Sequence, residues 1–187
     1  MSPRQHLQKL MQNRFVRAVT VLAGGTAIGQ VLMIAVLPLL TRLYTPEEFS
    51  VLAVYSGLVM IIAPAACLRL DIAIPMPERD EDAANLLVLA LFFAVMLSGI
   101  LALLIFTMPA DLVSLLRVPQ LEPFLWMLPL GVLLIASSSA LQFWSARKHR
   151  FTLIAKAKVT QASAGAGVMI GMGIFGATSS GLMFGQL

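Results

Sequence analysis

The sequence predicts an all-α protein, a polytopic transmembrane helical bundle, and two observations carry this prediction. First, five long apolar stretches contain no Asp, Glu, Lys, Arg or His, and each has the roughly 20 residues that an α-helix needs to cross a bilayer core. Second, 59% of the residues are hydrophobic and only 12% are charged, whereas soluble domains have about 25% charged residues. The stretches are Val19–Leu40, Phe49–Leu68, Leu86–Met108, Phe124–Phe143 and Val159–Thr178.

A sixth apolar stretch begins near Leu182 and reaches Leu187, the last residue of the sequence. We therefore expect about six helices, the sixth incomplete, in one transmembrane lobe over residues 19–187. Residues 1–18 form a basic N-terminal arm before it. The alternative, a water-soluble helical core, conflicts with the length and purity of the apolar stretches.

The basic residues predict the orientation of the bundle. Eleven of the thirteen Lys and Arg residues lie in the N-terminal arm or in the second and fourth loops, whereas the first and third loops hold only Arg42 and Arg117. Cytoplasmic loops carry an excess of Lys and Arg. The N-terminus and the loops Arg69–Asn85 and Phe143–Lys158 are thus expected in the cytoplasm.

The first loop contains a helix start signal. Thr45-Pro46-Glu47-Glu48 matches a capping box, with Thr45 as N-cap, a proline at the first helical position and a glutamate at the third. Both carboxylates also favour the positive end of the following helix.

Small and polar residues within the stretches predict helix contacts. Gly25 and Gly29 form a GxxxG pattern, and the fifth stretch is rich in glycine, which favours close backbone approach between helices. Gln30 and Gln161 lie deep in their stretches. Because a buried amide needs partners, they should face protein or a watery cavity. Interhelical hydrogen bonding is the simpler reading.

Several classes of function lack their signals in this chain. Cys67 is the single cysteine and lies within a stretch, so no disulfide framework or thiolate metal site is expected. No nucleophile elbow, P-loop, HExxH or paired intramembrane carboxylate is present. The basic pI near 9.7 is explained by topology rather than by nucleic acid. We expect a non-enzyme without a metal or cofactor.

Short motifs follow one another in a characteristic order, in the segments Gly24–Gln30, Leu37–Phe49, Leu68–Pro75, Phe143–Phe151, Val159–Gln161 and Gly181–Gln186. This order resembles that of bacterial polysaccharide-biosynthesis proteins, the oligosaccharide (O-antigen) flippases of the multidrug/oligosaccharidyl-lipid/polysaccharide superfamily. Two departures are Ser50, where family members often have glycine, and Leu70, where they often have an aromatic residue.

The resemblance implies a multi-pass protein of the bacterial inner membrane with two helical lobes around a cavity, of which this chain supplies the N-terminal one. It implies transport of an oligosaccharide linked to a polyprenyl pyrophosphate, for O-antigen, capsule or exopolysaccharide synthesis. The partners would be that lipid-linked oligosaccharide, membrane lipids and a second transmembrane lobe. Candidate substrate-binding residues are Arg42, Arg69, Asp71 and Gln30.

Arg42 and Arg69 are the candidate cavity cations, since guanidinium groups pair well with phosphate oxygens. Asp71 would orient Arg69. Snorkelling at a helix end is the alternative role for each arginine.

Three other functions stay open at this point. A drug exporter of the same superfamily would be expected to carry intramembrane carboxylates. A membrane-embedded polysaccharide polymerase or ligase would need a large external loop. A non-transporting truncated membrane protein is the third alternative.

Overall fold

The computed structural model describes residues 3–107, 119–174 and 178–186, and every regular element in these segments is a helix. The fold class predicted from the sequence is confirmed. The elements are α1 (Pro3–Leu43), α2 (Pro46–Ala66), α3 (Leu70–Ala73), α4 (Asp80–Thr107), the 3-10 helix η1 (Pro119–Phe124), α6 (Met127–Arg147), α7 (Phe151–Ile174) and α8 (Thr178–Gln186).

In the described segments, four helices are long and apolar enough to span a membrane. They are Val19–Leu43 of α1, and α2, α4 and α6. The predicted fifth span begins within α7, a helix of 24 residues. Residues 175–177 of that span lie outside the described residues, so its full length stays a prediction.

Helix boundaries differ from the predicted spans by up to about two turns. α4 begins at Asp80 rather than Leu86, because three acidic residues in its first turn complement the positive helix end. Residues 3–18 of the predicted basic arm form the first part of α1. The last helix begins at Thr178 rather than near Leu182.

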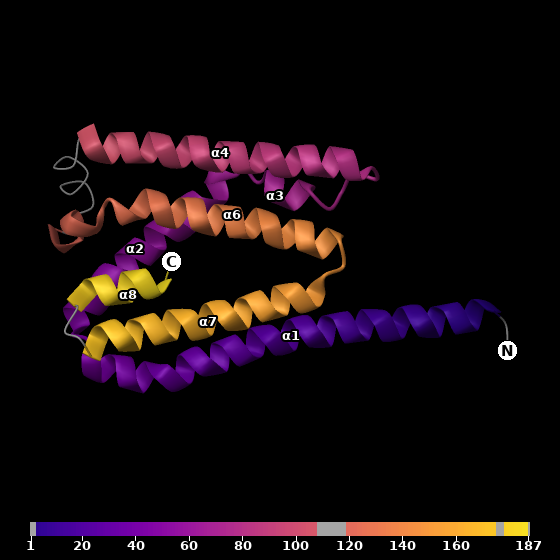
Figure 1. Ribbon diagram of the computed structural model, residues 1–187, viewed down its shortest axis with the longest axis horizontal. Coiled ribbons are helices and arrows are strands. Elements are labelled where there is room, and N and C mark those ends of the chain that lie inside the picture. Colours follow the sequence, from indigo (N-terminus) through magenta and orange to yellow (C-terminus); the bar gives the residue numbers. More distant parts are fainter. Residues whose placement is uncertain (1–2, 108–118, 175–177, 187) are drawn as a thin grey trace.

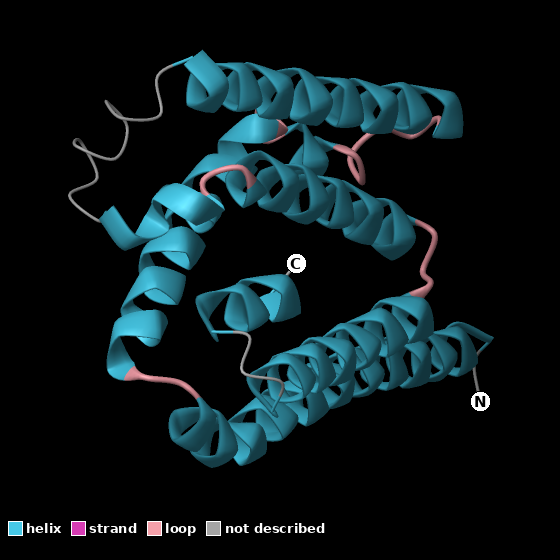
Figure 2. Cartoon of the chain, turned by 60° about the vertical axis from the view of Figure 1, so that its left-hand side comes forward, coloured by secondary structure: helices cyan, strands magenta, loops and turns pink. Residues whose placement is uncertain are grey.

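The long helices lie roughly along one axis in two groups (Figure 1). α4 and α6 run antiparallel on one side, and α1 and α7 run in parallel on the other. Between them lie α2, which crosses obliquely, and α8 (Figure 2). The N-terminus, the α2–α4 connection and the α6–α7 connection lie at the same end of the bundle. This grouping agrees with the charge pattern, and the cytoplasmic assignment of that end stays a prediction.

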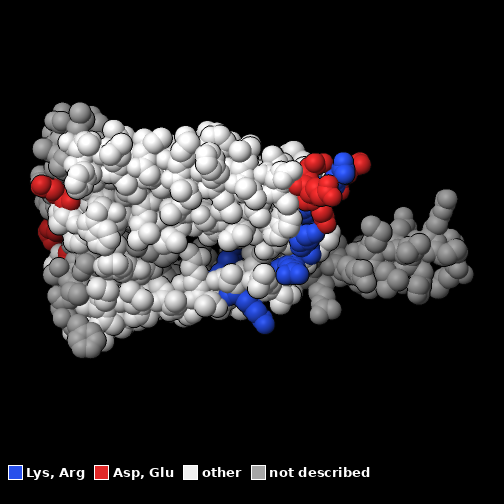
Figure 3. All heavy atoms as spheres, turned by 45° about the horizontal axis from the view of Figure 1, so that its top comes forward, with Lys and Arg blue, Asp and Glu red and all other residues white. Residues whose placement is uncertain are grey.

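Charges gather at the two ends of the bundle and leave an uncharged band between them over most of the face seen in Figure 3. Within the span Val19–Leu43 of α1, only 6% of the 18-residue apolar segment is buried inside the protein. A soluble protein rarely exposes so large an apolar surface. The long axis of the bundle therefore lies across a membrane.

Glycine allows α1 and α7 to approach closely, as the GxxxG pattern predicted. A Cβ on Gly25 would lie 2.6 Å from Cβ of Ala155, and one on Gly29 would lie 3.5 Å from Cβ of Ala162. A Cβ on neighbouring Gly24 would have no atom within 4 Å. The face of α1 that carries Gly25 and Gly29 is therefore the one that packs closely against α7.

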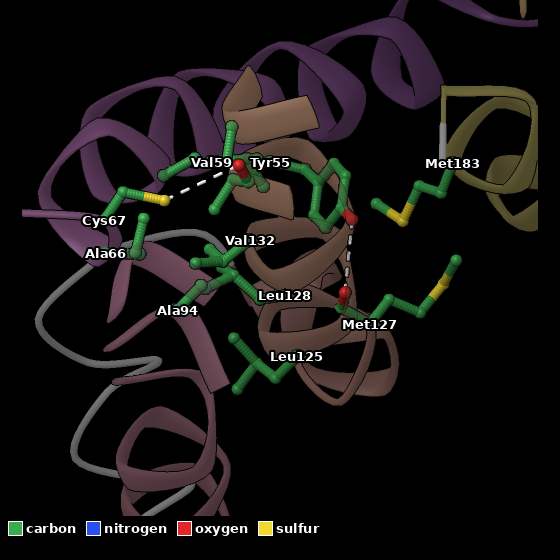
Figure 4. Packing of buried hydrophobic residues seen from close by; sticks show 14 of the residues in the cluster. Tyr55, Val59, Ala66, Cys67, Ala94, Leu125, Met127, Leu128, Val132 and Met183 are labelled. Atoms are coloured by element: carbon green, nitrogen blue, oxygen red, sulfur yellow. Dashed lines mark hydrogen bonds between the residues drawn. The ribbon is translucent and has the colours of Figure 1, made fainter. Parts of the chain in front are cut away.

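The main core lies between α2, α4 and α6 (Figure 4). Tyr55 is 1% exposed within it, and its hydroxyl donates to the Met127 carbonyl at 3.2 Å. A smaller cluster joins Leu40 and Tyr44 to Met169 and Leu182. Each group of helices therefore has its own buried apolar contacts.

The predicted capping box at the start of α2 is confirmed. The Thr45 hydroxyl accepts from the Glu48 N–H at 3.4 Å, and the Glu48 carboxylate accepts from the Thr45 N–H at 2.8 Å. This cap fixes the sharp turn by which the chain passes from α1 to α2.

Candidate functional site

A polar cavity of about 400 Å³ lies between α1, α2, α7 and α8. Its apolar and small lining residues include Met33, Leu52 and Ala162. Its polar lining residues are Thr26 and Gln30 of α1, Ser56 of α2, Lys158 and Gln161 of α7, and Gln186 of α8. Four helices therefore contribute polar side chains to one space in an otherwise apolar bundle.

Helix geometry places these groups on facing surfaces. Lys158 and Gln161 are three residues apart in α7, and Thr26 and Gln30 are four apart in α1, so each pair shares a helix face. The backbones of α7 and α8 lie close together at Gly165 and Gly185, where an added Cβ would strike the partner's backbone.

Ser56 and Gln186 join α2 to α8 at the wall of the cavity. The Ser56 hydroxyl donates to Oε1 of Gln186 at 2.7 Å. This contact satisfies two polar groups that would otherwise face apolar helices. It also holds α8 against α2.

The lining favours a ligand rich in hydroxyl groups or carrying negative charge. Glutamine amides and hydroxyls both donate and accept hydrogen bonds, whereas the Lys158 ammonium supplies donors and a positive charge. The lining contains no carboxylate. Within the described segments, Lys158 has no ion pair, so its charge is available to a ligand.

The four predicted site residues are not brought together. Gln30 lines the cavity, as expected of a deep amide. Arg42 lies exposed in the last turn of α1, and Arg69 lies exposed in the turn between α2 and α3, so neither lines the cavity.

Asp71 does not orient Arg69, contrary to the expectation from their spacing. Its side chain turns inward, is 4% exposed, and accepts a hydrogen bond from the Ser139 hydroxyl of α6 at 2.8 Å. The hydrogen bond from Ser139 satisfies one oxygen of the buried Asp71 carboxylate. The exposed guanidinium of Arg69 forms no ion pair in the described segments.

Sequence reasoning missed Lys158, Ser56 and Gln186. The position of Lys158 in the fourth loop marks it as a topology signal, and its spacing of three from Gln161 also places both residues on one face of α7. That shared face was the available signal. Nothing local marks Ser56 or Gln186, because their roles depend on how α2 and α8 pack.

In residues 3–107, 119–174 and 178–186, no three His, Cys, Asp or Glu side chains are placed to hold a metal ion.

The sequence profile of one family, described as polysaccharide biosynthesis protein, matches residues 39–187. The chain belongs to this polysaccharide biosynthesis protein family. Comparison with curated proteins and with solved structures gave no match. Family membership and the apolar bundle together show a membrane protein of polysaccharide biosynthesis, in agreement with the resemblance seen in its motifs.

Proposed function

We propose that the chain is the N-terminal lobe of a flippase that moves a lipid-linked oligosaccharide across the bacterial inner membrane. The observation that carries the proposal is the polar cavity among four helices, lined by three glutamine amides and Lys158 and free of carboxylates. Family membership supplies the biosynthetic context. Each feature suits a substrate with many hydroxyls and a pyrophosphate.

The proposed mechanism follows from the two halves of such a substrate. In the cavity, the amides of Gln30, Gln161 and Gln186 replace water as hydrogen-bond partners of the sugar hydroxyls, because an amide can both donate and accept hydrogen bonds. Lys158 attracts the pyrophosphate or an acidic sugar. The polyprenyl tail stays in lipid along the apolar exterior. A second lobe, rocking against this one, would expose the cavity to each side in turn.

Arg42 and Arg69 have a separate proposed role outside the cavity. Both are exposed, and neither lines the cavity. We expect them to contact the substrate's phosphates before or after the substrate occupies the cavity.

The proposal is for transport, not for catalysis or drug export. The polar residues of the cavity are amides, hydroxyls and one lysine, a set without a general base or an activated nucleophile. A site for cationic drugs would be expected to offer a carboxylate, and this lining has none.

Substitutions of cavity residues, made in the gene at its native locus, test the proposal. Lys158→Ala should lower glycan export about tenfold or more at normal membrane abundance, because a hydrogen bond to a charged group contributes about 1.5–3 kcal/mol. Gln30→Ala and Gln161→Ala should lower it less. The matched control is Lys156→Ala, on the same helix but outside this cavity. Equal export in the Lys158 and Lys156 alleles would refute the proposed site.

A further inference from the structure

A groove of about 380 Å³ follows the contact between α1 and α7, apart from the polar cavity. In the described segments only these two helices line the groove, and it shares no lining residue with the cavity. Because no other described helix contributes to its walls, the groove opens toward the membrane around the bundle. Its lining residues are Val21, Gly25 and Ile28 of α1, and Thr152, Ala155, Lys156, Val159 and Thr160 of α7.

The two walls of the groove differ in chemistry. Thr152, Lys156 and Thr160 follow one another at intervals of four residues, so they share one face of α7, and all three are exposed. Val21 and Ile28, two turns apart on α1, form an apolar wall. The groove therefore offers hydroxyls and one ammonium on the α7 side and an apolar surface on the α1 side.

The positive charge of Lys156 has no partner within the groove. The lining contains no carboxylate, and no ion pair in the described segments includes Lys156. The residue lies in the second turn of α7, near the end of the bundle that the charge pattern assigns to the cytoplasm (Figure 1). A lysine at that depth reaches the level of the lipid headgroups with its flexible stem.

We propose that the groove binds an anionic phospholipid of the cytoplasmic leaflet, with Lys156 on the phosphate and an acyl chain along Val21 and Ile28. The Thr152 hydroxyl, one turn nearer the start of α7, supplies a further hydrogen-bond donor for the headgroup. Basic pockets between membrane helices on the cytoplasmic side are typical sites for anionic headgroups. A zwitterionic lipid fits less well, because its ammonium meets no carboxylate in the lining.

This lipid site is separate from the proposed transport site. Lys156 lines the groove, whereas Lys158 lines the cavity. The bound phospholipid contacts both α1 and α7, because the groove is built from both helices. The inference does not rest on the transport proposal, so the failure of one leaves the other standing.

Native mass spectrometry of the full chain in detergent tests the proposal, with phosphatidylglycerol and phosphatidylcholine of identical acyl chains as the probes. The first phosphatidylglycerol should bind about fivefold more tightly than the first phosphatidylcholine, which is the contribution of one lysine near an anionic headgroup. Lys156→Ala should abolish this preference. The matched control is Arg150→Ala, an exposed cation in the preceding connection that does not line the groove, which should keep the preference.

Filling the groove distinguishes a shaped site from simple attraction between charges. Ile28→Trp keeps Lys156 but occupies the space of the acyl chain, so binding of phosphatidylglycerol should weaken about fivefold or more. Ile34→Trp, at an exposed position of the same helix outside the groove, should leave binding unchanged.

Three results would overturn the proposal. The first is equal affinity of the wild-type chain for the two phospholipids. The second is an equal effect of Lys156→Ala and Arg150→Ala on lipid preference, or an equal effect of the two tryptophan variants on binding. The third is tighter binding of polyprenyl phosphate than of phosphatidylglycerol, lost in Lys156→Ala, which would assign the groove to the transported lipid.

Discussion

Arg147 at the end of α6 holds Asp80 at the start of α4 with two hydrogen bonds to the same carboxylate oxygen, from Nε at 3.2 Å and from Nη2 at 3.1 Å. The same guanidinium donates to the carbonyls of Pro75, Pro77 and Glu78. Its side chain is only 11% exposed. One arginine thus orders the whole loop between α3 and α4.

We expect Arg147→Lys to loosen this loop, because an ammonium cannot reproduce a planar fork that serves four acceptors. Losing two or three hydrogen bonds of about 1 kcal/mol each should lower the Tm by several degrees. Limited proteolysis should cut near residues 75–80 faster. The control is Arg150→Lys, an exposed residue in the next connection. Equal cleavage of both variants would contradict the assigned role of Arg147.

Gly25 should tolerate no side chain, whereas Gly24 should. Gly25→Ala places a Cβ against the Ala155 backbone at 2.9 Å, and overpacking of this kind costs about 1–3 kcal/mol. Gly24→Ala meets open space and gains up to about 1 kcal/mol of helix propensity. Equilibrium unfolding of the two variants compares them. If Gly25→Ala were the more stable, the α1–α7 packing described here would be wrong.

Tyr44 joins the end of α1 to α7 through a hydrogen bond from its hydroxyl to the Met169 carbonyl at 2.6 Å. Burial, and secondarily the charge of Glu48, raise the pKa of Tyr44 above its ordinary value of 10.0. The neutral phenol is therefore the form that the fold favours. The stability that the fold gains by keeping the Tyr44 phenol neutral is complete below pH 10 and is lost as the pH rises through the raised pKa.

Ultraviolet titration of a Tyr55→Phe variant isolates Tyr44, since the chain has two tyrosines. The titration midpoint should lie above pH 10, and the further change Tyr44→Phe should cost about 1 kcal/mol of stability. A midpoint at or below pH 10 would show that the phenol is accessible to water.

Cysteine labelling tests the orientation of the bundle. In a Cys67→Ala background, Arg79→Cys and Lys148→Cys should react with an impermeant reagent only after the cytoplasmic side is opened, whereas Gln120→Cys should react in intact cells. The reason is that eleven of thirteen basic residues lie on the predicted cytoplasmic side. Strong labelling of position 79 in intact spheroplasts would reverse the topology.

The fold could be predicted from sequence because its determinants are local. The length of the apolar stretches predicted the helices, and Thr45 to Glu48 predicted the capping box. The spacing of Gly25 and Gly29 predicted the face of α1 that packs against another helix. The predicted fifth span starts within α7, and its residues 175–177 lie outside the described residues.

The candidate site could be predicted only in part because it depends on tertiary packing. Gln30 could be predicted, because an amide deep in an apolar helix needs hydrogen-bond partners however the helix packs. Lys158 and Gln186 acquire their role when α7 and α8 meet α1 and α2. The burial of Asp71 depends on the left-handed turn at Leu68 and Arg69, which no local pattern in these non-glycine residues announces.

The most direct test of the account is the sidedness of the lipid-linked oligosaccharide in cells depleted of the protein. An impermeant glycosidase added to spheroplasts reports the oligosaccharide exposed on the periplasmic leaflet. We predict that depletion makes the oligosaccharide accumulate out of the enzyme's reach, that the wild-type allele restores access, and that Lys158→Ala does not. Unchanged access after depletion would contradict the account.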